Sequence, residues 1–337
     1  MDEIMYLPWE KLSRCNILVT GATGLIGSSF VDMLMRNPHK DYQVYALGRN
    51  AQRAQTRFLR FKDDPTFHFL CGDVTLPLAR DESFHFIIHA ASNGSPNFFA
   101  NNPVEVMKSN LYGVSNLIEY GLAHDLKRFL YVSTGEVYGV NEVAVFDESS
   151  YGYVDILDTR SCYPSSKRAA ETLAMCYAAE YGADVVVARP CHTYGPYFTE
   201  FDNRVYAQFI RNVLNGDDIV MKSAGTQYRS WCYVEDCVSA LLYILLKGKS
   251  GEAYNVADKS SVVTIRELAE MIAHIAGCKV VMQEPSDKEK KGFTPIKHAV
   301  FETTKLEALG WSVSGTMDEK LRRTIDVCRS NVQATGK

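Results

Sequence analysis

Short apolar runs alternate with longer segments whose apolar residues recur at helical spacing through most of the chain. The first run, residues 16–20, opens into GATGLIG and then a helical pattern, which predicts a strand, a tight turn and a helix. Six later runs also predict buried strands, at 42–48, 67–74, 84–92, 128–134, 183–190 and 252–258. Strands that alternate with helices are typical of parallel βαβ units, so we expect an α/β fold with a doubly wound parallel sheet.

The pattern changes after Pro190, where the sequence becomes richer in loops between helical stretches near 204–215 and 264–277. We therefore expect residues 1–190 to form a Rossmann-type dinucleotide-binding domain, to which residues 230–260 return. Residues 191–330 are then expected to form mainly a smaller C-terminal α/β lobe that binds the substrate.

Three glycines in TGATGLIG have the spacing of a dinucleotide-binding turn. Gly21, Gly24 and Gly27 lie between the first predicted strand and helix. Glycines there let the backbone turn tightly and approach a pyrophosphate, whose charge the amide groups of the helix start can bind. The motif predicts a bound nicotinamide dinucleotide.

The ends of the next two predicted strands bear on which dinucleotide is held. An acidic residue after the second strand binds the ribose hydroxyls of NAD, but here Gly48 and Arg49 follow, with Arg53 nearby. These residues favour NADP, although Arg49 could also stack on the adenine. Asp73, after the third strand, is a candidate for binding the adenine edge.

Composition and charge exclude several classes of protein. The 337 residues are 46% hydrophobic with a net charge of -4, which disfavours a nucleic-acid partner. The N-terminus lacks a signal pattern and no apolar run is long enough to span a membrane, so we expect a soluble, cytoplasmic protein. The nine cysteines have no metal-site spacing, and we expect reduced thiols and no metal.

The segment CYPSSK contains the candidate catalytic pair. Tyr163 and Lys167 are four residues apart at the start of a predicted helix, so both side chains share one face. An ammonium nearby favours the phenolate, which can accept a hydroxyl proton beside a cofactor. Thr134, at the end of the strand 128–134, supplies a hydroxyl that could share the same substrate proton.

Six motifs in order, TGATGLIG, HAAS, STGEVYG, YPSSK, RPCHTYGP and RSWCYVEDCVSAL, resemble those of the extended short-chain dehydrogenases/reductases that act on nucleotide sugars. The resemblance covers roughly residues 15–325. It implies NAD as the usual cofactor and transient oxidation of the sugar at C4, with Tyr163 as base and Thr134 bound to the 4-hydroxyl. It also implies that Lys167 lowers the pKa of Tyr163 and binds the nicotinamide ribose.

The triplet Thr134-Gly135-Glu136 separates the reactions that this family performs. The 4,6-dehydratases carry Thr-Asp-Glu, so the acid that protonates the departing hydroxyl is absent here. Simple 4-epimerases generally need no carboxylate at position 136. UDP-glucuronate decarboxylases carry Thr-Ser-Glu, and in them the arginine at the position of Arg204 lies near the substrate carboxylate. The resemblance is greatest to the decarboxylases, with 4-epimerisation and 4,6-dehydration as alternatives.

The resemblance also implies substrate contacts and an assembly. Arg229 would bind the nucleotide pyrophosphate, and His192 stands where an asparagine usually contacts the sugar diphosphate. Helices at 103–123 and 164–181 resemble the pair that forms a homodimer interface. A further alternative of another class is a non-catalytic dinucleotide-sensing protein that keeps the fold, although intact Thr134, Tyr163 and Lys167 count against it.

Overall fold

The computed structural model describes residues 7–200, 202–285 and 296–335. Its larger sheet has seven parallel strands in the order β10-β6-β5-β4-β1-β2-β3. The strands are β1 (Asn16–Thr20), β2 (Gln43–Gly48), β3 (Phe67–Cys71), β4 (Phe86–His89), β5 (Arg128–Val132), β6 (Val185–Pro190) and β10 (Ala253–Val256). The predicted α/β fold class is confirmed. Strands β3 and β4 are shorter than the predicted 67–74 and 84–92, because the residues that follow leave the sheet and line a cavity.

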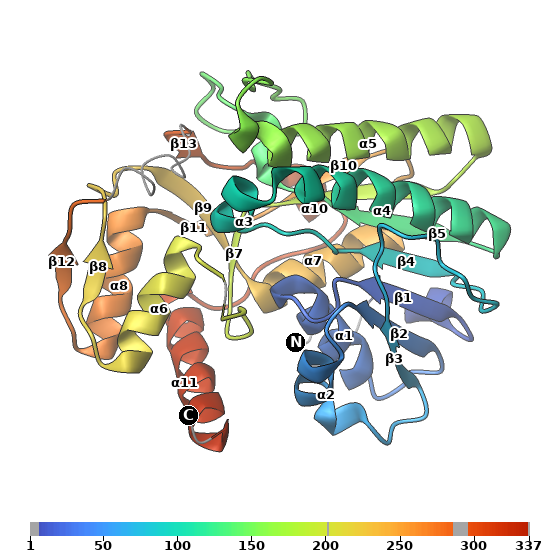
Figure 1. Ribbon diagram of the computed structural model, residues 1–337, viewed down its shortest axis with the longest axis horizontal. Helices are drawn as coiled ribbons and strands as arrows, with labels where there is room; N and C mark the ends of the chain where they lie inside the picture. Colours follow the sequence, from blue (N-terminus) through green and yellow to red (C-terminus); the bar gives the residue numbers. More distant parts are fainter. Residues whose placement is uncertain (1–6, 201, 286–295, 336–337) are drawn as a thin grey trace.

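Helices cover both faces of this sheet, as Figure 1 shows: α4 and α5 lie side by side on one face, and α1 and α7 lie on the other. Alternate residues of β1 therefore enter two cores. Ile17 and Val19 pack in the core that contains α1 and α7, whereas Leu18 packs in the core beneath α4 and α5. These helices are α1 (Leu25–Arg36), α4 (Pro103–Ala123), α5 (Cys162–Tyr181) and α7 (Val234–Lys247).

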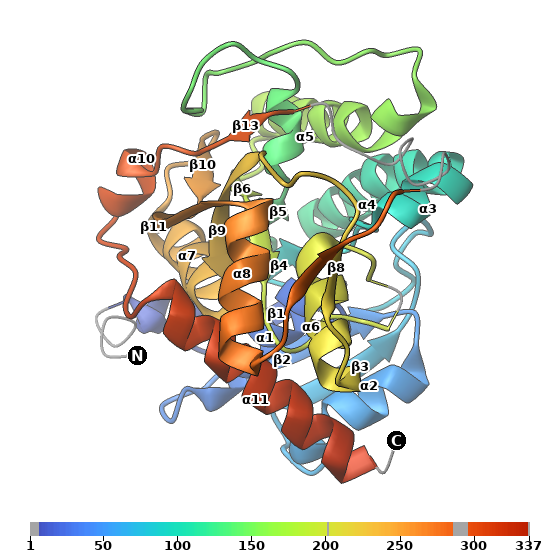
Figure 2. The ribbon, with the colours of Figure 1, turned by 90° about the vertical axis from the view of Figure 1, so that its left-hand side faces the viewer.

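The rest of the chain forms the C-terminal lobe, seen face-on in Figure 2. One small sheet has the order β11-β9-β13, with β7 paired to β9, and a second consists of β12 and β8. The strands are β7 (His192–Tyr194), β8 (Ile219–Met221), β9 (Tyr228–Tyr233), β11 (Asp258–Thr264), β12 (Val280–Met282) and β13 (His298–Ala299). The longer helices are α6 (Val205–Asn215), α8 (Ile265–Ala276) and α11 (Met317–Thr335).

Short helices complete the described part of the chain. They are η2 (Trp9–Leu12), α2 (Ala51–Arg57), η3 (Leu59–Phe61), α3 (Pro96–Asn101), η4 (Gly135–Tyr138), η5 (Thr159–Ser161) and α10 (Thr304–Glu307). None of the helices in the described ranges is both long and apolar enough to span a lipid bilayer.

At three places in the described part of the chain, the chain passes between the large sheet and the lobe with one residue or none between the two elements. β6 leads to β7 through the single residue Cys191, β9 runs directly into α7, and β10 leads to β11 through Ala257. Of the range 230–260 expected to return to the large sheet, only α7 and β10 do so. The ends of that range lie in β9 and β11 of the small sheet, so the expectation is corrected there.

Candidate active site

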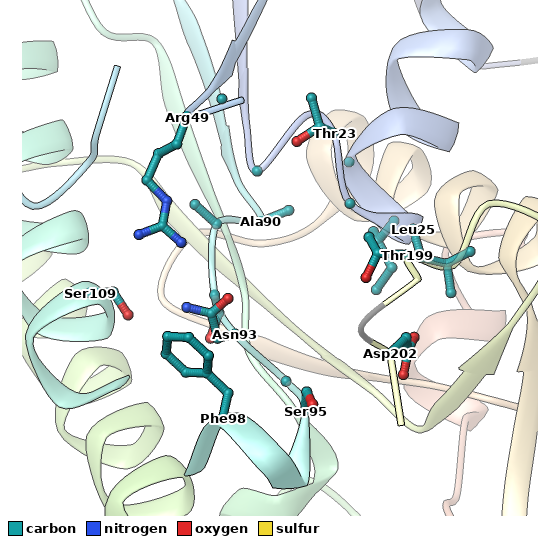
Figure 3. A pocket seen from close by; sticks show the side chains of 18 of the residues that line it. Thr23, Leu25, Arg49, Ala90, Asn93, Ser95, Phe98, Ser109, Thr199 and Asp202 are labelled. Carbon is teal, nitrogen blue, oxygen red and sulfur yellow. The ribbon is translucent and has the colours of Figure 1, made fainter. Parts of the chain in front are cut away.

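Two cavities meet between the large sheet and the lobe. The first, of about 910 Å³, lies at the carboxyl ends of the parallel strands, and we call it the sheet-end cavity (Figure 3). The second, of about 790 Å³, lies beside the lobe, and we call it the lobe cavity. Tyr163, Arg204 and Ser133 line both. The carboxyl end of a doubly wound sheet is where ligands of such folds bind.

The turn between β1 and α1 forms one wall of the sheet-end cavity. Gly21 has φ +64°, and a Cβ there would lie 2.6 Å from the carbonyl oxygen of Ala90. A Cβ on Gly27 would lie 2.3 Å from the carbonyl oxygen of Gly21, so only glycine fits either position. Gly24 precedes α1 without a capping side chain. The backbone at the start of α1 can thus approach an anion closely, which fits a dinucleotide pyrophosphate.

Arg49 and Asp73 lie at the far end of the same cavity. The Arg49 side chain is 58% exposed, and its Nη1 is 3.7 Å from Oδ2 of Asp73. Asp73 also accepts hydrogen bonds of 2.9 Å from the amide and the hydroxyl of Thr75. Burial raises the pKa of Asp73, but the Thr75 hydrogen bonds and the Arg49 charge outweigh it and lower the pKa below its usual value.

The first turns of α5 hold the predicted catalytic pair. Lys167 is 2% exposed, and its Nζ donates a 2.8 Å hydrogen bond to the carbonyl oxygen of Val132. Burial lowers the pKa of Lys167 to about 7, against the opposing charge of Glu171. The Nζ lies 5.9 Å from the centroid of the Tyr163 ring.

The pKa of Tyr163 is raised to about 12, mainly by burial and then by the charge of Glu136. A hydrogen bond with Thr134 and the charges of Arg204 and Arg160 act in the lowering direction. From the sequence we expected Lys167 to lower this pKa. Lys167 instead donates to a backbone carbonyl, and the lowering contributions of Thr134 and the two arginines do not outweigh burial.

Glu136 has a partner that the sequence analysis did not identify. Arg160 binds its carboxylate with both terminal nitrogens, at 3.0 and 3.1 Å. The Arg160 guanidinium also lies 4.8 Å above the Phe99 ring, which stacks on Tyr163 at 4.5 Å between centroids. Arg160 lies only three residues before Tyr163 in DTRSCY, but no motif marked it. Its contacts come from η4 and α3, far away in the sequence.

Gly135 is fixed by a residue of the C-terminal segment. A Cβ on Gly135 would lie 2.1 Å from Cζ of Phe301, so the Phe301 ring occupies the space that a side chain at position 135 would need. Phe301 is 3% exposed and also lines the lobe cavity. The glycine that distinguishes this chain from Thr-Ser-Glu and Thr-Asp-Glu sequences is therefore matched by a bulky aromatic ring.

Arg204 and His192 both reach the lobe cavity. Arg204 pairs with Asp202 through Nη2 and Oδ2 at 2.5 Å, and its side chain remains one-third exposed. The ring of His192 packs on Trp231 at 5.3 Å, and burial, with the charges of Arg229 and Arg204, lowers its pKa to about 3. His192 is therefore a neutral imidazole at physiological pH.

Arg229 lines the lobe cavity from β9. It is 2% exposed and donates to the carbonyl oxygens of Tyr228 and Ile296 at 2.7 and 2.6 Å, and to that of Lys297 at 3.2 Å. Burial lowers its pKa to about 10, so it stays charged at neutral pH. The arginine thus ties β9 to the segment beginning at residue 296 and adds positive charge to the cavity wall.

A model of the NAD dependent epimerase/dehydratase family matches residues 17–257. UDP-glucuronic acid decarboxylase 6 of Arabidopsis thaliana is 35% identical over 92% of this chain and 87% of its own. UDP-glucuronic acid decarboxylase 1 of Xenopus tropicalis is 31% identical over 97% of this chain and 76% of its own.

Among solved structures, DesIV, a dTDP-glucose 4,6-dehydratase from Streptomyces venezuelae with bound NAD, superposes with a TM-score of 0.83. It is 25% identical and covers 95% of this chain and 98% of its own. These likenesses confirm the resemblance that the motifs carried and agree with NAD as the cofactor.

Proposed function

The chain belongs to the NAD dependent epimerase/dehydratase family, and on that premise we propose that it decarboxylates UDP-glucuronate or a closely related nucleotide sugar. The observation that carries this proposal is the state of Glu136. Its side chain is bound by Arg160 beside Tyr163, and no second acid stands at position 135. Decarboxylases among the relatives support the same choice.

The glycine turn at Gly21, Gly24 and Gly27 would hold the pyrophosphate of NAD, with Asp73 at the adenine end. Lys167, which lines the sheet-end cavity, would contact the nicotinamide ribose. When bound, the cofactor supplies the acceptor for transient oxidation of the sugar at C4, and the reduced form that reverses it. The chain's own residues then position the sugar and move its protons.

Tyr163 lies where the two cavities meet, so it can reach both a cofactor and a sugar. We assign it as the base that takes the proton of the sugar's 4-hydroxyl, with Thr134 sharing that hydrogen bond. The C4 ketone makes a C5 carboxylate a β-keto acid, which loses carbon dioxide readily. No acid is needed to expel a leaving group, and the chain provides none at position 135.

Arg204, Arg229 and His192 would bind the substrate in the lobe cavity. Arg204 keeps an exposed edge that can bind the uronate carboxylate, since one side of its guanidinium is taken by Asp202. Arg229 adds charge for the pyrophosphate. His192 is neutral and can both donate and accept hydrogen bonds to a sugar hydroxyl or phosphate.

A second candidate is 4-epimerisation, favoured by Gly135. With Phe301 filling the space at this position, the site resembles an epimerase site that needs no group to act at C5 or C6. A 4,6-dehydratase reaction lacks its acid, and a purely dinucleotide-sensing role leaves the buried Tyr163 and Lys167 pair unexplained.

The test is mass spectrometry of the purified protein incubated with UDP-, dTDP-, CDP- and GDP-sugars, including UDP-glucuronate. We expect UDP-glucuronate to lose the mass of carbon dioxide, and the Tyr163→Phe variant to do so about 10²- to 10⁴-fold more slowly. An isobaric product separable by chromatography would replace this proposal with epimerisation. Loss of water from a hexose would replace it with dehydration, and cofactor binding without any turnover would favour the sensor.

We also propose that the protein is a homodimer. Exposed apolar side chains follow the outer surface of α4 and α5, namely Val104, Met107, Tyr112, Leu122 and Tyr181. Sedimentation velocity should show a dimer that the Met107→Glu, Tyr112→Glu double variant converts to a monomer. The control Leu59→Glu, at an exposed leucine outside α4 and α5, should leave the dimer intact. A monomeric wild type at micromolar concentration would refute it. A cytoplasmic location stays a prediction from the sequence.

A further inference from the structure

A buried ion pair that the proposed mechanism does not use joins α5 to β6. Glu171 and Arg189 are 9% and 2% exposed, and Arg189 binds both carboxylate oxygens, through Nη2 at 2.7 Å and Nε at 3.1 and 3.3 Å. Arg189 also donates to the carbonyl oxygen of Glu148 at 2.8 Å and the hydroxyl of Tyr151 at 2.9 Å. Apolar side chains in place of a buried pair often give equal stability, so stability alone is a weak reason for these charges.

The Glu171 carboxylate is connected to the active site through Ser133. Ser133 immediately precedes Thr134 and lines both cavities. Its hydroxyl donates a hydrogen bond to Oε1 of Glu171, and its amide donates one of 2.8 Å to the carbonyl oxygen of Ala188. Ser133 is thus anchored through its side chain and its backbone, one residue before the hydroxyl that would share the substrate proton.

The same carboxylate lies one helical turn after Lys167. Residues four apart share a face of a helix, so Glu171 and Lys167 both point from α5 toward the end of β5. The charge of Glu171 acts to raise the pKa of Lys167, against the burial that lowers it to about 7. Near this pKa, a change in the local charge strongly changes the fraction of Lys167 that is protonated at neutral pH.

The titratable groups on neighbouring elements do not compensate the Lys167 ammonium. His89 of β4 is a neutral imidazole, because burial lowers its pKa to about 3. The Tyr131 ring of β5 has its centroid 4.7 Å from the Lys167 Nζ. Burial raises the pKa of Tyr131 and of Tyr163, so neither phenol is charged near pH 7. Glu171 is therefore the acid placed to compensate this ammonium.

From these contacts we propose that Glu171 is a positioning residue for Lys167 and Ser133. Its carboxylate stabilises the ammonium of Lys167 and anchors the Ser133 hydroxyl, and Arg189 holds the carboxylate in place. The inference deepens the proposed function and rests on it, because the charge of Lys167 matters to catalysis only if this residue acts beside a bound nicotinamide dinucleotide. It assigns a task in the reaction to a buried pair that touches neither cofactor nor sugar.

The direct test is an NMR titration of the Lys167 side chain in the full-length protein with its bound dinucleotide. Glu171→Gln keeps the size and an acceptor but removes the charge, and the titration midpoint should move about one pH unit lower. Asp184→Asn is the matched control at the other end of β5, where Asp184 pairs with Arg128 at 2.8 Å, and should leave the midpoint unchanged. An unmoved midpoint in Glu171→Gln would overturn the proposal.

A second variant keeps the test valid if Glu171→Gln does not fold, since that change leaves Arg189 buried without its partner. The Glu171→Met, Arg189→Met double variant removes both charges and is expected to fold. Its Lys167 midpoint should move in the same direction by a smaller amount, because the loss of the arginine charge acts oppositely. A midpoint equal to that of the wild type would show that the pair is only structural.

Kinetics separate the two contacts of the carboxylate. Glu171→Gln should lower turnover at pH 7.5 about tenfold with little change in the KM of the nucleotide sugar, because fewer molecules carry a protonated Lys167. Ser133→Ala removes one hydrogen bond but no charge, so the Lys167 midpoint should stay while turnover falls less. The NMR titration contains no nucleotide sugar. A moved midpoint in a protein that leaves UDP-glucuronate intact would refute the sugar reaction alone, and an unmoved midpoint in an active decarboxylase would refute the role of Glu171 alone.

Discussion

The two cavities of this protein hold their charges in different ways. In the sheet-end cavity the pair Arg49 and Asp73 is long, at 3.7 Å, and the arginine is mostly exposed. In the lobe cavity Arg160 binds the Glu136 carboxylate through two nitrogens, and the Arg160 side chain is 18% exposed. An exposed ion pair contributes little to stability, whereas an ion pair removed from water is costly to break. On the proposed function, we therefore expect substitutions in the sheet-end cavity to change cofactor affinity and substitutions in the lobe cavity to change turnover.

The largest effect is expected from breaking the pair on the lobe side. Arg160→Gln leaves the Glu136 carboxylate uncompensated near Tyr163, and we expect turnover to fall about 10²-fold, since truncating one partner of a desolvated pair costs roughly 2–5 kcal/mol and partial exposure reduces that. Because Arg160 lowers the pKa of Tyr163 and Glu136 raises it, and because Tyr163 must lose its proton to act as base, the acidic limb of the pH profile should also move to higher pH. Arg160→Lys keeps the charge without the bidentate contact, so its turnover should lie between those of the wild type and Arg160→Gln. A fall in turnover with an unmoved profile would show that Arg160 is only structural.

The next effect concerns the buried ammonium of Lys167 in the wall of the sheet-end cavity. The pKa of Lys167 falls from 10.5 to about 7 on folding, so the unfolded chain binds more protons than the folded one between these values. The stability of the wild type relative to Lys167→Met should therefore rise with pH above 7, by about 1.4 kcal/mol per unit, and be lowest at and below pH 7. Urea unfolding of both proteins at pH 7, 8 and 9 measures it. A constant difference would show that Lys167 titrates normally.

A smaller effect should follow from adding a side chain at position 135. Gly135→Ser forces its Cβ onto the Phe301 ring, and overpacking of this kind costs about 1–3 kcal/mol. Thermal unfolding should show the loss, and Phe301→Leu in the same chain should recover most of it, although Phe301→Leu alone destabilises. If the effects of the two substitutions on the free energy of unfolding were additive, the Phe301 ring would not be the group that excludes a serine at position 135.

The smallest effect is expected at the exposed pair of the sheet-end cavity. Asp73→Asn removes a charge whose partner is solvated but keeps an acceptor for the Thr75 amide. Cofactor affinity should fall by less than about fivefold, equivalent to 1 kcal/mol or less, and turnover at saturating cofactor should not change. Titration and steady-state kinetics together test this. A loss as large as that of Arg160→Gln would remove the distinction between the two cavities.

The parts of the site that could be predicted from the sequence are those whose residues lie close together in the chain. The turn at Gly21 to Gly27 and the pair Tyr163 and Lys167 are each contiguous, so their spacing alone specifies a strand-turn-helix and a shared helix face. The seven strands of the large sheet were predictable for the same reason, because each lies in a short, largely apolar run. The ends of β3 and β4 were overestimated where small and polar residues continue into the cavity wall.

The lobe cavity could not be predicted in this way, because its contacts join distant segments. Arg160 meets Glu136 across 24 positions, and Phe301 reaches Gly135 from the C-terminal part. The lobe strands are as short as the two residues of β13, which gives no measurable periodicity, and the polar helix α11 was not predicted either. The placement of Arg204 near the substrate carboxylate was expected only from the family resemblance, and the roles of these residues stay predictions.

The three shortest junctions between the large sheet and the lobe have a mechanical consequence. Each contains one residue or none, so none of the three supplies a flexible linker about which the two parts could rotate. The edge strand β10 of the large sheet also comes after β9 in the chain, and β9 belongs to the small sheet of the lobe. We therefore expect that neither part folds when it is expressed alone. On the proposed function, the separation between cofactor and sugar is set when the chain folds.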